Sequence, residues 1–307
     1  MNSRAKLYGY ADVGPYGLTH SLLAWARCRL WCTQHNVPML APSWFRLKGH
    51  IGPLLRREYD KRLYFRLFEF PGYVSGLQKL SILATSSFLL PDTVADGYPA
   101  DIKKQTVFLF KNTVSRNEEL YFHQIRGRSE LVLSELRNIT KAKYLPHIDD
   151  TPHIAVHVRL GDFSRSSNLM ALHEGCKNTS LPIDWYCDVL ATLQSKLGRF
   201  KTVVYSDGSN DDLMPLLRMH DVVRSPRQPS ITDLLSIAQA KLVVSSGSGF
   251  STWGAYLANS PRICYPGQRF VRVLEPDNEL ELEPEYEEHT DLSTDFLEYI
   301  HGRISSP

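Results

Sequence analysis

The stretch HIAVHVRLGD, residues 153–162, decides how this chain folds. Its apolar run is short and lies between Pro152 and a Gly-Asp turn, a pattern typical of a buried parallel strand. Alternation along a strand places His157 and Arg159 on one face at the carboxyl end, where ligands bind in open α/β sheets. The permanent charge of the Arg159 guanidinium suits an anionic ligand such as a phosphate. The alternative is a structural ion pair between Arg159 and Asp162 that closes the turn.

Strands and helices alternate on both sides of this stretch. After it, the pattern predicts strands at 201–207, 241–246 and 261–266 and helices at 183–197, 211–219, 231–240 and 252–259. Before it, the pattern predicts strands at 6–10, 37–42 and 106–110 and helices at 21–34 and 118–141. Alternation at this spacing predicts doubly wound parallel sheets, so the fold class is α/β with two Rossmann-like domains facing a central cleft.

We expect three regions in the chain. Residues 1–150 form an N-terminal Rossmann-like domain, and residues 151–270 form a C-terminal one. In the remaining region, 271–307, the segment 275–288 carries eight acidic residues and neither lysine nor arginine, which predicts an exposed, mobile connection. A closing helix is expected over 292–303.

Composition limits the class of protein. Among 307 residues, 43% are hydrophobic, 22% are charged and the net charge is +2, so no overall electrostatic attraction to nucleic acid is expected. No secretory signal is visible, and no apolar run approaches the roughly 20 residues that span a bilayer. Five scattered cysteines suit reduced thiols. These features predict a cytoplasmic protein.

Two segments allow more than one interpretation. Residues 53–70 are basic and amphipathic, so they could make peripheral contact with an anionic membrane or hold an acidic acceptor; the alternative is a solvated helix face. Cys28, Cys32 and His35 would share one helical face, but no fourth ligand is evident, and we expect no metal site. Gly14 and Gly17 precede the first predicted helix, where they form either an anion-binding turn or a plain connection.

A second polar loop follows the strand predicted at 241–246. The run Gly247-Ser-Gly-Phe-Ser-Thr-Trp-Gly254 combines hydroxyl groups, glycines and a helix start, which together suit a negatively charged group. The alternative is ordinary helix capping by Ser251 or Thr252. Asp207 ends a predicted strand and Asp233 lies at a helix start. Either carboxylate could serve as a cap or accept hydrogen bonds from a nucleobase.

Three motifs in order resemble the α1,2-fucosyltransferase group of the wider GDP-fucose-dependent transferase superfamily. They are H157-x-R159-x-G161-D162, then Y205-S206-D207, then S248-x-F250-S251-x-W253-G254-A255-Y256-L257, and they cover roughly residues 150–266. A weaker similarity lies in Gly17-Leu18-Thr19-His20, where the group usually has Asn and Gln in the last two places. Leu160 stands where the group's signature has a second arginine.

The resemblance implies a GT-B architecture and an inverting, metal-independent transfer of fucose from GDP-fucose to a glycan hydroxyl. The C-terminal domain would bind the donor and the N-terminal domain the acceptor, with no further cofactor. No Asp-x-Asp sequence is present to hold a divalent ion. Two alternatives remain open: another nucleotide-sugar donor, or a catalytically silent protein that binds sugar nucleotides.

The same resemblance assigns roles to residues. Arg159 is the catalytic candidate, through contact with the β-phosphate; His157 would contact or orient the nucleotide, and Asp162 would hold Arg159. The other residues expected to bind the nucleotide sugar are Asp207 and Asp233 at the guanine, Ser248, Gly249, Phe250 and Ser251 at the diphosphate and sugar, and Gly17 and His20 from the N-terminal loop. Asp12, Asp162 and Glu174 are all candidates for the base, and none is chosen.

Overall fold

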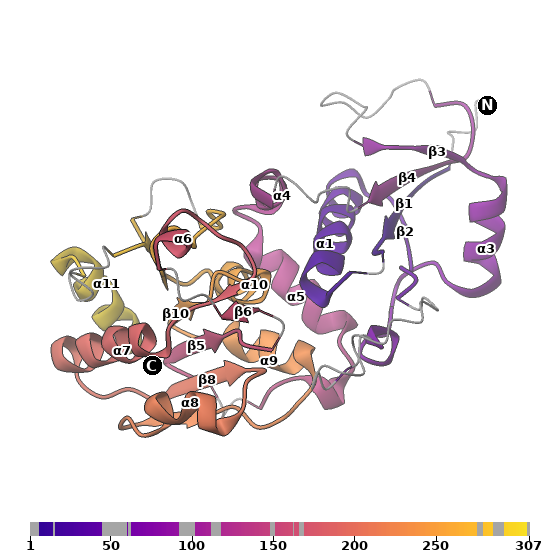
Figure 1. Cartoon of the computed structure of the whole chain (residues 1–307). Coiled ribbons are helices and arrows are strands. Elements are labelled where there is room, and N and C mark those ends of the chain that lie inside the picture. The colour runs from indigo at the N-terminus through magenta and orange to yellow at the C-terminus, as the bar shows by residue number, and fades with distance from the viewer. Residues whose placement is uncertain are drawn as a thin grey trace. The chain divides into compact units, whose positions relative to one another are not determined.

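The computed structural model describes residues 6–14, 16–44, 60, 63–91, 102–111, 118–147, 151–161, 163–165, 169–274, 279–284 and 292–305. The chain divides into two compact units. The first consists of Met1–Gly49, Arg62–Ile125 and Leu131–Ala142; the second consists of His50–Lys61, Arg126–Glu130 and Lys143–Pro307. Each unit is built on its own parallel sheet, which Figure 1 shows by labelled strands.

The first unit contains a four-stranded sheet in the order β2-β1-β4-β3. Its strands are β1 (Leu7–Asp12), β2 (Met39–Leu40), β3 (Ser87–Leu89) and β4 (Thr106–Lys111). Its helices are α1 (Leu18–His35), α3 (Gly76–Thr85), α4 (Glu118–Ile125) and, from Leu131 onward, α5 (Ser129–Ile139), with a 3-10 turn at Tyr64–Arg66. The helix predicted over 118–141 is therefore two helices, because Gly127 has a φ of 71°, which an α-helix cannot contain.

Helix α1 packs tightly on strand β1. A Cβ atom on Gly9 would lie 2.2 Å from the Cys32 sulfur and 3.0 Å from the Cys28 sulfur. Both thiols are buried, and burial raises the pKa of Cys28 well above its ordinary value. Among the described residues, no group of three or more His, Cys, Asp or Glu side chains is arranged to hold a metal ion. The two thiols therefore fill space between helix and sheet.

The second unit contains a six-stranded sheet in the order β12-β11-β10-β5-β8-β9, with every neighbouring pair parallel. The strands are β5 (Ile154–Val158), β8 (Thr202–Ser206), β9 (Val222–Arg224), β10 (Leu242–Ser245), β11 (Arg262–Cys264) and β12 (Glu281–Leu282). The helices are α7 (Ile183–Leu197), α8 (Asn210–Leu217), α9 (Ser230–Ile237), α10 (Gly249–Ala258) and α11 (Thr294–Ser305). Between β5 and α7 lie β6 (Ser164–Arg165), α6 (Leu169–His173) and β7 (Thr179–Ser180). Two units with parallel sheets confirm the predicted α/β fold class.

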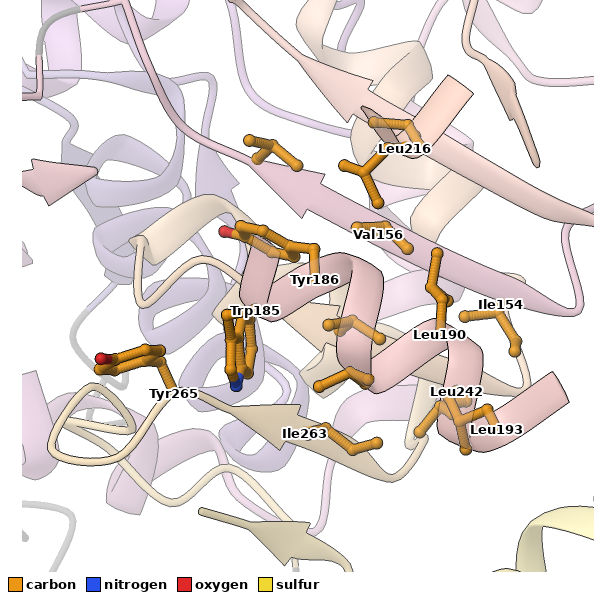
Figure 2. Close-up of a cluster of buried hydrophobic side chains, with 14 of the residues drawn as sticks. Ile154, Val156, Trp185, Tyr186, Leu190, Leu193, Leu216, Leu242, Ile263 and Tyr265 are labelled. Carbon is orange, nitrogen blue, oxygen red and sulfur yellow. The ribbon is translucent and has the colours of Figure 1, made fainter. Parts of the chain in front are cut away.

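The core of the second unit lies between α7 and the sheet. All five residues of β5 are buried, as expected of a central strand in a parallel sheet. Figure 2 shows Leu190 of α7 extending toward β5 near Val156, and these residues belong with Tyr186 to one buried cluster. Because buried residues recur along α7 at helical spacing, one face of that helix covers the strands.

Strand order fixes where a ligand would bind. The chain leaves β5, adds β8 and β9 on one side, and then returns to add β10 on the other side of β5. Winding therefore reverses between β5 and β10. In open α/β sheets the crevice beyond the carboxyl ends of two such strands is the usual ligand site.

The acidic connection differs from the prediction. Residues 279–284 are described, and among them Glu281 belongs to β12 and is only 6% exposed. It forms an ion pair with Arg262 of β11, which is 0% exposed. An exposed connection is thus the wrong prediction for Glu281, because the buried guanidinium needs a carboxylate partner.

Two expectations from the sequence concern a membrane: that no segment spans it, and that the basic segment 53–70 could contact its surface. No helix in the described ranges is both long and apolar enough to cross a bilayer. Of the basic segment 53–70, only Asp60 and residues 63–70 are described, and Tyr64, Leu67 and Phe68 are buried there. Membrane contact through this segment stays a prediction, since most of its arginines and lysines lie outside the described residues.

Candidate functional site

Three neighbouring strands of the second unit end side by side. The register pairs His157 with Tyr205 and Val158 with Ser206, while Val156 pairs with Val244 of β10. Arg159, Asp207 and the serines after β10 consequently follow the carboxyl ends of adjacent strands. This edge includes the place where the winding of the sheet reverses.

Arg159 and Asp207 form an ion pair at this edge. The Arg159 Nη1 atom lies 2.7 Å from Asp207 Oδ2, and the two side chains are 24% and 19% exposed. The other carboxylate oxygen, Oδ1, accepts a hydrogen bond from the Leu160 amide at 2.8 Å. Gly161 permits this close approach, because a Cβ there would lie 2.5 Å from Asp207 Oδ2. Asp162, expected to hold Arg159, lies outside the described residues.

His157 is buried, and its ring contacts the residues that follow β10. Its ring stacks on that of Phe250, with centroids 5.1 Å apart and planes 22° apart. Its Nδ1 atom lies 2.7 Å from the Ser246 Oγ and 3.3 Å from the Ser248 Oγ. Burial, reinforced by the nearby charge of Arg159, lowers the pKa of His157 to about 3. The imidazole is therefore neutral at physiological pH.

Helix α10 begins at Gly249, earlier than the predicted start at 252. Ser248 is its N-cap: the Oγ accepts from the Ser251 amide, and the carbonyl accepts from the Thr252 amide at 3.1 Å. The alternative interpretation, in which Ser251 or Thr252 caps the helix, is thus wrong; the Ser251 hydroxyl donates to the Ser248 carbonyl at 3.0 Å. Because the first amides of a helix lack intrahelical acceptors, those of Gly249 and Phe250 are available to an anion.

Gln268, a residue that the sequence analysis missed, shapes this loop through Gly247. Gly247 has a φ of 70° and lies against Gln268, whose carbonyl oxygen would be 3.0 Å from a Cβ at that position. Gln268 is buried and donates to the Leu172 carbonyl at 2.7 Å and the Cys176 carbonyl at 3.2 Å. Gln268 therefore connects the serine loop, residues 246–248, to α6 and to the segment that follows it. A polar residue after a short strand carries no local signal for such a role.

Asp233 lies in the first turn of α9 and does not cap it. Its Oδ1 accepts from Gln228 Nε2 at 2.7 Å and from the Ser225 hydroxyl at 3.0 Å. Burial raises the pKa of Asp233 to about 7, and the nearby Asp60 carboxylate adds to the shift. The cap is supplied by Asp60, which accepts from the Ser230 amide at 2.7 Å and from the Ser230 hydroxyl.

The N-terminal loop belongs to the first unit. Gly17 is the N-cap residue of α1 and offers no side chain, while the Leu18 amide donates to the Tyr64 hydroxyl at 3.1 Å. His20 is exposed, and its ring centroid lies 6.4 Å from that of Tyr16. The structure thus brings the other described candidates, from His157 to Ser251, into the second unit, and places Gly17 and His20 in the first.

No protein-family model and no curated protein matches this chain. Solved structures similar to it include POFUT1 in complex with GDP, at 12% identity over 86% of this chain and 98% of that one, with a TM-score of 0.42. The fucosyltransferase NodZ from Bradyrhizobium is similar at 14% identity, 86% and 95% coverage and a TM-score of 0.44. The E. coli heptosyltransferase WaaC with ADP-2-deoxy-2-fluoro heptose is similar at 12% identity, 95% and 98% coverage and a TM-score of 0.41.

Proposed function

We propose that this chain is an inverting glycosyltransferase that moves fucose from GDP-fucose to a hydroxyl of a glycan acceptor, forming an α1,2 linkage without a metal ion or another cofactor. The observation that supports it most is that two sources of positive potential follow β5 and β10, the adjacent strands between which the winding of the sheet reverses. Arg159 follows β5, and the amino end of α10 follows β10. His157 lies close to both. Its ring contacts Ser246 and Phe250, and the charge of Arg159 helps to lower its pKa.

The proposed reaction places charge on the leaving group. The acceptor oxygen attacks C1 of fucose from the face opposite the diphosphate, and the bond from C1 to the β-phosphate oxygen breaks. The acceptor hydroxyl gives its proton to a base, for which Asp12, Asp162 and Glu174 are the candidates, and from there it passes to solvent. GDP departs with one more negative charge than it carried in the donor. The Arg159 guanidinium and the α10 amides are prearranged to stabilise that charge, which is the kind of interaction that accelerates such a step most. In the proposal these groups replace a divalent ion.

The proposed guanine site is centred on Asp233. Its Oδ1 is occupied by Ser225 and Gln228, and its Oδ2 accepts no hydrogen bond from a described residue. A carboxylate oxygen accepts two donors well, and guanine presents N1–H and N2–H side by side, whereas uracil presents a single N–H. Asp207 is the second expected guanine contact, although it is held by Arg159 and the Leu160 amide.

A donor panel tests the proposed function. We expect transfer or slow hydrolysis of GDP-fucose with EDTA present, and little with other GDP-sugars or UDP-sugars. In thermal unfolding, GDP at 100 times its Kd should stabilise the protein by about 2.7 kcal/mol, and UDP at the same concentration much less. Activity that EDTA abolishes would overturn the metal-free mechanism. Equal stabilisation by GDP and UDP would overturn the guanine assignment.

GDP binding should depend on pH through Asp233. The folded pKa of about 7 means that the carboxylate form, which accepts the guanine N–H groups, prevails above pH 7 and is lost as pH falls through 7. We expect GDP affinity to fall roughly tenfold between pH 8 and pH 6, since each pH unit below a pKa reduces the ionised fraction about tenfold. His157, with a pKa of about 3, does not titrate in this range. Isothermal titration calorimetry at several pH values measures the change.

The control is Asp233→Asn. This variant should bind GDP more weakly at pH 8 and show only the residual pH dependence of the nucleotide's own phosphate. Asp211→Asn, at an exposed position in the first turn of α8, should keep the wild-type profile. A profile that Asp233→Asn leaves unchanged would contradict the assignment.

A further inference from the structure

Ser246 occupies a central position in the serine loop that the roles assigned above do not use. It directly follows β10 and is 2% exposed. Its Oγ lies 2.7 Å from His157 Nδ1 and 3.0 Å from the Ser248 Oγ. A buried hydroxyl between an imidazole and a helix cap determines how protons are arranged in both.

The direction of these hydrogen bonds follows from proton counting. A serine hydroxyl carries one proton, and the geometry has Ser246 donating it to the Ser248 Oγ. Ser246 therefore turns a lone pair toward His157. A separation of 2.7 Å between a nitrogen and an oxygen needs a proton between them, and His157 Nδ1 must supply it. The chain of donation runs from His157 to Ser246 to Ser248.

The protonation state of the other ring nitrogen, Nε2, follows from that of Nδ1. The His157 imidazole is neutral, so a proton on Nδ1 leaves Nε2 with a lone pair. No described residue hydrogen-bonds Nε2. The Phe250 ring, stacked on the imidazole, restricts rotation of the His157 side chain. Nε2 is thus an acceptor held in a fixed direction.

We propose that Ser246 is a positioning residue, which fixes His157 as the Nδ1–H tautomer and so makes Nε2 a hydrogen-bond acceptor for an O–H or N–H group of the bound nucleotide sugar. The identity of the ligand rests on the proposed function; the tautomer does not. An acceptor at Nε2 repels phosphate oxygens. Contact with the diphosphate then falls to Arg159 and the α10 amides, while His157 orients a hydroxyl-bearing or base portion of the donor.

Nitrogen-15 NMR of histidine-labelled protein tests the tautomer without any activity. We expect the His157 signals, identified by their absence in His157→Gln, to show a protonated Nδ1 and an unprotonated Nε2 between pH 6 and pH 8. Ser246→Ala should lose this state, giving a mixture or the reverse tautomer. Ser246→Thr, which keeps the hydroxyl, should restore it. A protonated Nε2 in the wild type, or an unchanged Nδ1–H in Ser246→Ala, would overturn the proposal.

A binding measurement separates this proposal from the proposed function. Ser246→Ala should weaken GDP binding about 3- to 10-fold, the effect of one misdirected hydrogen bond, and Ser246→Thr should recover most of it. Ser236→Ala is the control for loss of a buried hydroxyl, because Ser236 donates only within α9, and it should leave both the tautomer and the affinity unchanged. The expected tautomer without GDP binding by the wild type would support positioning and overturn the proposed donor. GDP binding by a wild type with the opposite tautomer would support the proposed donor and overturn the positioning role of Ser246.

Discussion

Arg159→Ala is expected to lower the turnover of GDP-fucose roughly 10²–10³-fold, because a prearranged charge at the leaving group acts mainly in the transition state. Folding should be little affected. The pair with Asp207 is partly exposed, and such pairs contribute about 0–1 kcal/mol to the free energy of unfolding. Asp207 also keeps its bond from the Leu160 amide. Steady-state kinetics alongside thermal unfolding measures both effects.

Two further variants sharpen this prediction. Arg159→Lys keeps the charge but lacks the planar fork of a guanidinium, so activity between that of the wild type and Arg159→Ala is expected. Arg218→Ala removes an exposed arginine at the end of α8 and is the matched control, with near-normal kinetics expected. Near-normal turnover by Arg159→Ala would remove the residue from the mechanism.

Elements with a strong apolar pattern were predictable from the sequence. The helix expected over 183–197 has those bounds in the structure. Its apolar residues recur at helical spacing, and a proline precedes the helix while a glycine follows it. The central strand was similarly recognisable from a short apolar run ending in charged residues. Their alternation was enough to predict the class of fold and the edge of the sheet at which the candidate site lies.

Contacts between distant residues were not predictable in the same way. Asp60 caps the helix that begins at Ser230, 170 positions later, and no local pattern links the two. The start of α10 was misplaced because several hydroxyl-bearing residues in a row can each serve as a cap, and only the backbone shows that Ser248 does. The burial of Glu281 was not predictable from the acidic run around it, because that burial depends on Arg262 in another strand.

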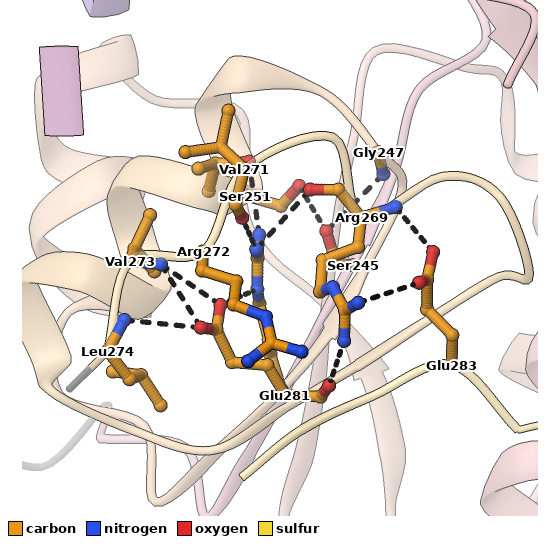
Figure 3. A network of polar contacts seen from close by, with 12 residues as sticks. Ser245, Gly247, Ser251, Arg269, Val271, Arg272, Val273, Leu274, Glu281 and Glu283 are labelled. Carbon is orange, nitrogen blue, oxygen red and sulfur yellow. Dashed lines mark hydrogen bonds and ion pairs between the residues drawn. The ribbon is translucent and has the colours of Figure 1, made fainter. Parts of the chain in front are cut away.

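The ion pair between Arg262 and Glu281 is the most deeply buried one among the described residues, with exposed side-chain fractions of 1% and 4%. Arg262 Nε lies 2.7 Å from Glu281 Oε1, and the guanidinium also donates to the Val271 carbonyl and to Thr252 Oγ1. Figure 3 shows Glu281 also accepting from the amides of Val273 and Leu274. One carboxylate thus connects the last strands of the sheet to the segment between them.

Glu281→Ala is expected to lower the free energy of unfolding by at least about 3–5 kcal/mol, because it leaves a buried guanidinium without a partner. It also removes the acceptor of the Val273 and Leu274 amides, which adds to that loss. Glu283→Ala is the matched control: Glu283 pairs with Arg269 at 3.3 Å, but the two side chains are 22% and 26% exposed, so a loss of about 0–1 kcal/mol is expected. Urea unfolding of both variants measures the difference. Equal losses would contradict the role of burial.

A double variant separates loss of charge pairing from loss of the backbone contacts. Arg262→Met with Glu281→Leu removes both charges, so the unpaired guanidinium that makes Glu281→Ala costly is gone. The amides of Val273 and Leu274 still lose their acceptor, which costs roughly 1–3 kcal/mol for each buried group left unsatisfied. We therefore expect the double variant to be more stable than Glu281→Ala and less stable than the wild type. If it were no more stable than Glu281→Ala, the carboxylate would stabilise the fold through the two amides rather than through Arg262.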